Sequence, residues 1–104
     1  MSFNKMFIMG TVGREPQLKF NEKGDPLCYL AVSINETIKE QETTTWYQVI
    51  LFGNQAEQAR KKLTKGSNVY IEGRLRPQQI KDKQGEVHTV LEVAGTTFHC
   101  LDSF

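Results

Sequence analysis

The sequence has few cysteines and no long apolar run. Its 104 residues include only two cysteines, Cys28 and Cys100, and three prolines. The first residues, Met1 to Lys5, lack the apolar segment of a signal peptide. We therefore expect free thiols in a cytoplasmic protein and no disulfide framework. No apolar stretch approaches the roughly 18 residues of a membrane span.

The sequence also lacks the patterns of a catalytic or metal site. No Gly-rich phosphate loop precedes a helix. Asp82 and Glu86 flank a predicted hairpin tip, where carboxylates are ordinarily solvated, and His88 is expected on the surface. The two cysteines and two histidines offer four zinc ligands in principle, but no pair has zinc-knuckle spacing. We predict a protein that is no enzyme and needs no metal or cofactor.

The charges are unevenly distributed along the chain. The net charge is only +1, yet residues 60–83 carry eight cations and two carboxylates, a local net charge of +6. Those cations are Arg60, Lys61, Lys62, Lys65, Arg74, Arg76, Lys81 and Lys83. A local basic surface can bind phosphates even on a nearly neutral molecule. The alternative is a charged face that is simply solvated.

The most informative segment is 46–53, Trp-Tyr-Gln-Val-Ile-Leu-Phe-Gly. Its aromatic and β-branched residues predict a strand that Gly53 ends. Strand alternation places the apolar Tyr47, Val49 and Leu51 on one face. The other face consists of Trp46, Gln48, Ile50 and Phe52. Nucleobases stack on exposed aromatic rings whatever their sequence, at about 1–3 kcal/mol each. The alternative is that both rings are large core or interface residues.

The chain reads as one domain, residues 1–104, with five strands and one helix. The first strand is expected to bend at Gly10 and Gly13, so that it can belong to two sheets of a barrel. A polar stretch, 36–45, predicts a loop or a protruding hairpin. The predicted strands are 5–20, 27–35, 46–53, 69–75 and 87–93, with a hairpin tip at 82–85.

The single predicted helix follows Gly53. Asn54 is expected to cap it, with Glu57 completing a capping box, and Gly66 is expected to mark its end. The order is therefore three strands, a helix and two strands. This order predicts an all-β, five-stranded Greek-key barrel of the oligonucleotide-binding (OB) type, with one helix between strands 3 and 4. A two-layer α+β sheet is the competing architecture.

Three segments, 4–20, 45–53 and 63–76, resemble bacterial single-stranded DNA-binding proteins, and the resemblance spans residues 4–98. It implies a non-catalytic OB barrel that coats single-stranded DNA near the nucleoid during replication, recombination or repair. It also implies a homo-oligomer, a tetramer or a dimer, and partners among replication proteins. Subunit contacts are expected around Phe7, Met9 and Tyr47.

The resemblance also assigns candidate DNA-binding residues. Trp46 and Phe52 match stacking aromatics of the family, and the matching cations are expected to displace counterions from phosphates. The cations are Lys5, Lys19, Lys65 and Arg76, with Arg74 beside them. Together these seven residues form the predicted site.

The sequence departs from the family pattern in two ways. Ile38 and Ile80 stand where the family has two further tryptophans, and polar residues replace several cations, namely Gln48, Asn54, Gln78 and Gln79. We therefore expect weaker DNA binding than in a typical member. The chain also stops at 101–104, Leu-Asp-Ser-Phe, without the long acidic C-terminal tail of the family.

Other functions fit parts of the pattern. The short length and the missing aromatics resemble primosomal replication protein N, an adaptor in replication restart that would act mainly through protein contacts. In a pure interaction module, Trp46, Phe52 and the two isoleucines would be subunit contacts. A cold-shock RNA chaperone is a third possibility, but its aromatic pattern is absent from the first strands.

Overall fold

A computed structural model describes residues 1–102 of the chain. Its elements are β1 (Met6–Val12), β2 (Gln17–Phe20), β3 (Pro26–Ile38), β4 (Gln41–Phe52), α1 (Asn54–Lys62), β5 (Asn68–Lys81) and β6 (Val87–Cys100). The strands follow one another in the order β1-β5-β6-β4-β3-β2, and an additional β1–β3 pairing closes the sheet into a barrel. Because β1 and β2 are two halves of the predicted first strand, the five-stranded OB barrel with one helix is confirmed.

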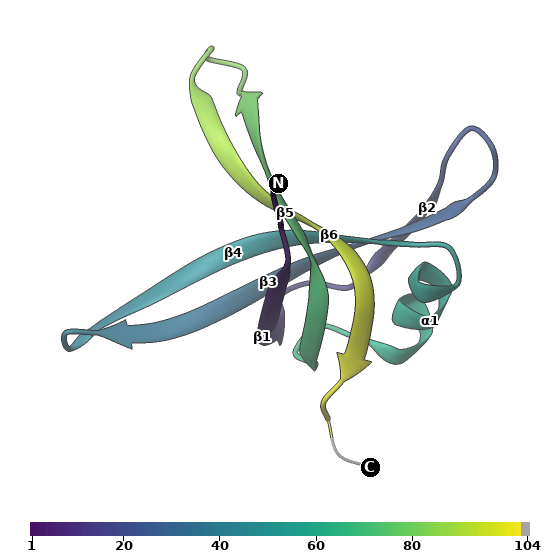
Figure 1. The fold of residues 1–104 in the computed structure, drawn as a ribbon, viewed down its shortest axis with the longest axis horizontal. Helices are drawn as coiled ribbons and strands as arrows, with labels where there is room; N and C mark the ends of the chain where they lie inside the picture. Colours follow the sequence, from purple (N-terminus) through teal and green to yellow (C-terminus); the bar gives the residue numbers. More distant parts are fainter. Residues whose placement is uncertain (103–104) are drawn as a thin grey trace.

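The barrel core consists of inward-facing side chains from every long strand. Leu30, Val49, Leu51, Ile71 and Val93 are all completely buried. The parallel pairing between β4 and β6, Gln48 to Glu92 and Ile50 to Ala94, joins the two halves of the sheet. As a result the outward faces of β3, β4, β6 and β5 lie side by side (Figure 1).

The first strand joins two neighbours, but it is not continuous. β1 pairs with β5 over Met6–Thr11 and with β3 at Thr11 and Val12. A Cβ on Gly10 would lie 2.3 Å from the Ser33 carbonyl oxygen, so only glycine permits this close crossing. The predicted passage through to Phe20 is wrong, because pairing stops after Val12 and resumes at β2.

Two long hairpins extend from the barrel (Figure 1). The β3–β4 hairpin includes the polar stretch 36–45 and reverses at Lys39 and Glu40, both with positive φ. The β5–β6 hairpin reverses at 82–86, as predicted. These strands run several residues beyond the predicted ends, because ladder hydrogen bonds continue where the side chains no longer alternate between core and solvent.

The helix α1 covers one end of the barrel (Figure 1). Ala56, Ala59 and Leu63 are fully buried against the core. The predicted Asn54 cap is wrong: Gly53, with φ 61° and ψ −133°, occupies the N-cap position, and no side chain caps the helix. The Gly53 carbonyl accepts the first helical N–H groups, from Ala56 and Glu57. Glycine alone adopts this backbone readily, so Asn54 becomes the first helical residue.

Candidate nucleic-acid interface

The sheet register places the predicted aromatic and basic residues of β2, β4 and β5 on one outer face. Trp46, Gln48 and Phe52 alternate outward along β4, while Val49 and Leu51 alternate into the core. This confirms the predicted division for these residues, but Ile50, which was predicted on the same side as Trp46, is buried at 8% exposure. We call the outward side of β2, β3, β4, β6 and β5 the β4 face.

Trp46 lies near the middle of β4, and 54% of the residue is exposed. Its ring rests against Gly13, because a Cβ built on that glycine would lie 2.4 Å from Cζ3 and 2.5 Å from Cη2 of the indole. A shallow pocket of about 330 Å³ adjoins the ring. Its lining consists of Arg14, Ala31, Trp46, Tyr47, Gln48, Thr89, Val90 and Leu91. The indole therefore offers an open aromatic surface beside a guanidinium and an amide.

Phe52 is the last residue of β4 and is 46% exposed. It pairs with Leu27 of β3, which pairs in turn with Lys19 of β2, so the three side chains form one row across the face. The Lys19 ammonium lies 5.1 Å from the ring centre of Tyr29, at cation–π distance. A predicted stacking residue and a predicted cation thus lie in one row, two strands apart.

Arg76 lies on the β4 face in a row of paired residues that crosses β4, β6 and β5. Gln48 pairs with Glu92, and Glu92 pairs with Arg76. Arg76 Nη2 donates to Glu92 Oε1 at 3.3 Å, and the carboxylate is largely buried. The Arg76 charge is therefore partly compensated within the protein. Arg74, two residues earlier on the same face, is exposed.

Lys5 and Lys65 belong to none of the strands of the β4 face. Lys5 is not a free cation: its Nζ lies 3.4 Å from Glu72 Oε1 and 5.2 Å from the ring centre of Phe7. Lys65 is exposed in the loop after α1, and its backbone N–H donates to Glu15 Oε1 at 3.1 Å. This bond holds the Lys65 loop beside the segment that supports Trp46.

Two residues near the predicted site were missed by sequence reasoning. Arg14 lines the pocket beside Trp46. It belongs to the matched segment 4–20, so its position in the motif was an available signal. Glu92 places a carboxylate on the face, and the predicted hairpin tip at 82–85 was an available signal, because the hairpin register sets Glu92 opposite Arg76. No sequence signal places Glu92 beside Gln48, because the parallel β4–β6 pairing joins strands about forty positions apart.

Groups outside the β4 face show less functional organisation. A larger pocket, about 620 Å³, lies between α1 and the end of β6 and is not lined by any predicted site residue. Cys28 is completely buried in the core. Burial raises the pKa of the Cys28 thiol, and Arg60 partly opposes that effect.

Among residues 1–102, no helix has the length and apolarity to cross a membrane.

Comparisons with known proteins agree with this arrangement. The profile of the single-strand binding protein family matches residues 3–101. Single-stranded DNA-binding protein 1 of Xylella fastidiosa (strain 9a5c) is 34% identical in an alignment of 106 positions. The alignment covers 96% of this chain and 78% of that protein. A solved structure, the Plasmodium falciparum SSB complex with ssDNA, superposes with a TM-score of 0.84 at 25% identity. The match covers 98% of this chain and 97% of that one.

Proposed function

The chain belongs to the single-strand binding protein family, and we propose that it coats single-stranded DNA along its β4 face, independently of base sequence. Single-stranded DNA binding, without catalysis, is the activity of this family and of this protein. We further propose a role in replication, recombination or repair at the nucleoid, where single strands are exposed.

The observation that carries this proposal is the exposure of Trp46 and Phe52 on one strand face. A core role would bury these residues, yet about half of each is accessible. Every base has a flat π surface, so stacking holds any sequence at about 1–3 kcal/mol per base. Bases stacked on protein cannot re-pair, and the strand is kept open.

Cations around these rings are proposed to bind the backbone phosphates. Arg74, Lys19 and Lys65 are exposed, and Arg14 adjoins the Trp46 pocket. Each phosphate contact releases counterions, with a log–log salt slope of about 0.7 per contact for single strands. Lys5 and Arg76 are each paired with a carboxylate, so we assign them smaller contributions.

Binding is proposed to be weaker than in family members that have more aromatic residues. Ile38 and Ile80 are exposed on the two long hairpins, at 56% and 50%. Each offers contact area to a base but no π face. Loss of a stacking ring at such a position would reduce affinity by about 1–3 kcal/mol per base.

A homo-oligomer, a dimer or a tetramer, is proposed to form through β1. Phe7 and Met9 are exposed at 59% and 63%, and Phe7 continues into a stack with Tyr70 and His99. Tyr47 is less suited to this role, because it is partly buried against the core. A charge at Met9, in a Met9→Lys variant, should lower the assembly mass in light scattering. An unchanged mass would contradict this interface.

Tryptophan fluorescence tests the proposed DNA-binding mode directly. Trp46 is the only tryptophan, so stacking on poly-dT should quench its emission. Trp46→Ala should weaken binding of labelled dT, dA and dC oligomers by about 1–3 kcal/mol each. Phe3→Ala, which removes an exposed ring outside the strands, is the control. Unchanged emission with saturating oligonucleotide at low salt would contradict stacking on Trp46 and would favour the adaptor role.

A further inference from the structure

A mixed cluster of nitrogen and oxygen donors lies at the tip of the β5–β6 hairpin. Asp82, Glu86 and His88 each offer one donor atom, and these three atoms all lie within 4.8 Å of one another. These three residues lie outside the rows that contain Trp46, Phe52 and the predicted DNA-binding cations. We propose that these three side chains form a binding site for a divalent transition-metal ion of the Zn²⁺ class.

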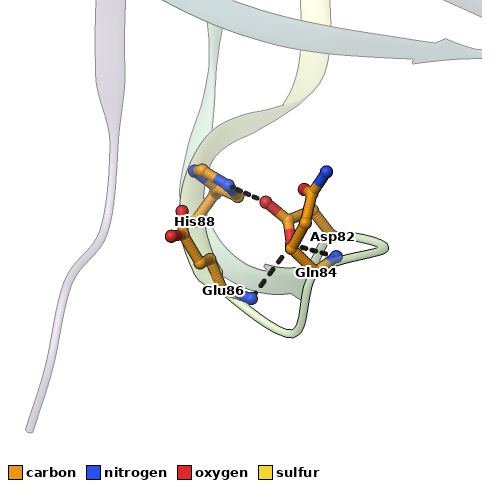
Figure 2. Close-up of polar contacts among 4 residues, drawn as sticks. All are labelled: Asp82, Gln84, Glu86 and His88. Carbon is orange, nitrogen blue, oxygen red and sulfur yellow. Dashed lines mark hydrogen bonds and ion pairs between the residues drawn. The ribbon is translucent and has the colours of Figure 1, made fainter.

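The hairpin turn fixes the first ligand. Asp82 Oδ1 accepts the backbone N–H groups of Gln84 and Glu86, each at 2.9 Å. The turn is closed by the Asp82 N–H, which donates to the Glu86 carbonyl at 2.9 Å, and by Gly85 with φ +82°. One carboxylate oxygen is thus used by the turn, and the other, Oδ2, is directed at His88 (Figure 2).

The strand register supplies the other two ligands on the same side of the hairpin. Ile80 pairs with His88, so Asp82 and His88 share a face, and Glu86 precedes His88 by two residues, just before β6 begins at Val87. Lys81 alternates to the opposite face, which keeps its ammonium out of the donor set. Figure 2 shows the Glu86 carboxylate beside the imidazole of His88.

The donor geometry suits a small ion after minor side-chain movement. Zn²⁺ binds imidazole nitrogen and carboxylate oxygen at about 2.0–2.2 Å, so tetrahedral ligands are separated by about 3.3 Å. His88 Nε2 lies 2.7 Å from Asp82 Oδ2, and an ion would replace this hydrogen bond as the two atoms separate. The third ligand atom is a carboxylate oxygen of the exposed Glu86. Rotation of this side chain brings the oxygen to the ion.

The chemistry of the donors selects the class of metal. One imidazole and two carboxylates suit Zn²⁺ and neighbouring first-row ions, whereas Mg²⁺ prefers oxygen ligands and octahedral geometry. Three protein ligands leave a fourth position for water in a tetrahedral site. The hairpin tip is solvated, so an ion can reach the site without any opening of the barrel.

Calorimetric titration of the full chain with Zn²⁺ tests this site without DNA, so its outcome is separate from the proposed DNA binding. We expect one ion per chain, and His88→Ala and Glu86→Gln should each lower the affinity at least about tenfold. Asp82→Asn keeps an oxygen for the turn and should have the same effect. Mg²⁺ should not compete.

Two controls distinguish this site from adventitious binding. His99→Ala removes the other histidine, and Cys100→Ser removes the partly exposed thiol. Both variants should bind Zn²⁺ as the parent protein does. The proposal is overturned if Zn²⁺ does not bind, or if binding is lost in these two controls and retained in His88→Ala. Thermal unfolding of each variant should show that the barrel is intact.

Discussion

The indole of Trp46 rests on the backbone of Gly13, with no side chain between them. A Cβ at position 13 would fall within 2.5 Å of two ring carbons. Gly13 was expected to mark a bend of the first strand; the structure shows that it also leaves room for the ring. This contact sets the position of the surface on which we propose that a base stacks.

Gly13→Ala should therefore weaken DNA binding without unfolding the protein. The φ of Gly13 lies outside the left-handed region, and the clash is with the far end of an exposed side chain, so the ring moves rather than the backbone. We expect a shifted Trp46 emission and a loss of up to about 1–3 kcal/mol for every oligonucleotide sequence.

A double-mutant cycle isolates this effect. In a Trp46→Ala background, Gly13→Ala should change DNA affinity by less than about 0.5 kcal/mol, because the displaced ring is absent. An equal loss in both backgrounds would show that Gly13 acts independently of Trp46.

Glu92→Gln should strengthen DNA binding. The carboxylate both compensates Arg76 and repels phosphates on the β4 face. Removing its charge releases Arg76 for a phosphate contact, so we expect affinity to rise up to about tenfold at low salt, or about 1.4 kcal/mol. The log–log salt slope should steepen by about 0.7.

Titrations at several salt concentrations measure both quantities. Glu57→Gln on α1, outside the β4 face, provides the control for a simple change in net charge. Equal gains in the two variants would mean that Glu92 acts only through long-range electrostatics.

Lys65→Ala should reduce the salt dependence of binding. The Lys65 side chain is exposed, and its loop is bonded to the segment that supports Trp46. Loss of one phosphate contact should lower the slope by about 0.7. Lys61→Ala, on the helix, is the matched control. A slope unchanged from that of the parent chain would remove Lys65 from the phosphate path.

Stability should fall at alkaline pH partly because of Cys28. Burial raises the pKa of this thiol in the folded state. The folded protein therefore keeps the proton more tightly than the unfolded chain, whose thiol titrates near about 8.5. The stabilisation is complete below that pH and is lost as the pH rises through the folded-state pKa.

Urea unfolding at pH 7.5 and at pH 9.5 measures this loss. Cys28→Ala should be less stable at both pH values, since it leaves a cavity, but its stability should depend less on pH. The same pH dependence in both proteins would assign the alkaline effect to other groups.

Local patterns in the sequence were sufficient for much of the fold. The alternation of Val49 and Leu51 with Trp46 and Phe52 separates core from surface, because strand side chains point in opposite directions at every step. The hairpin tip at 82–85 could also be predicted, since it depends on adjacent residues. The last two residues, Ser103 and Phe104, lie outside the described part of the chain.

Residues far apart in the sequence decided the rest. The contact of Gly13 with Trp46, and the row that brings Gln48 beside Glu92 and Arg76, form only when distant segments of the chain come together. The N-cap of the helix is likewise Gly53 and not the predicted Asn54, because the chain leaves β4 with a positive φ that glycine adopts readily. The sequence by itself determined which side chains face outward, because alternation is local. Only the tertiary structure decided which of them meet and which charges are compensated, because strand pairing is not local.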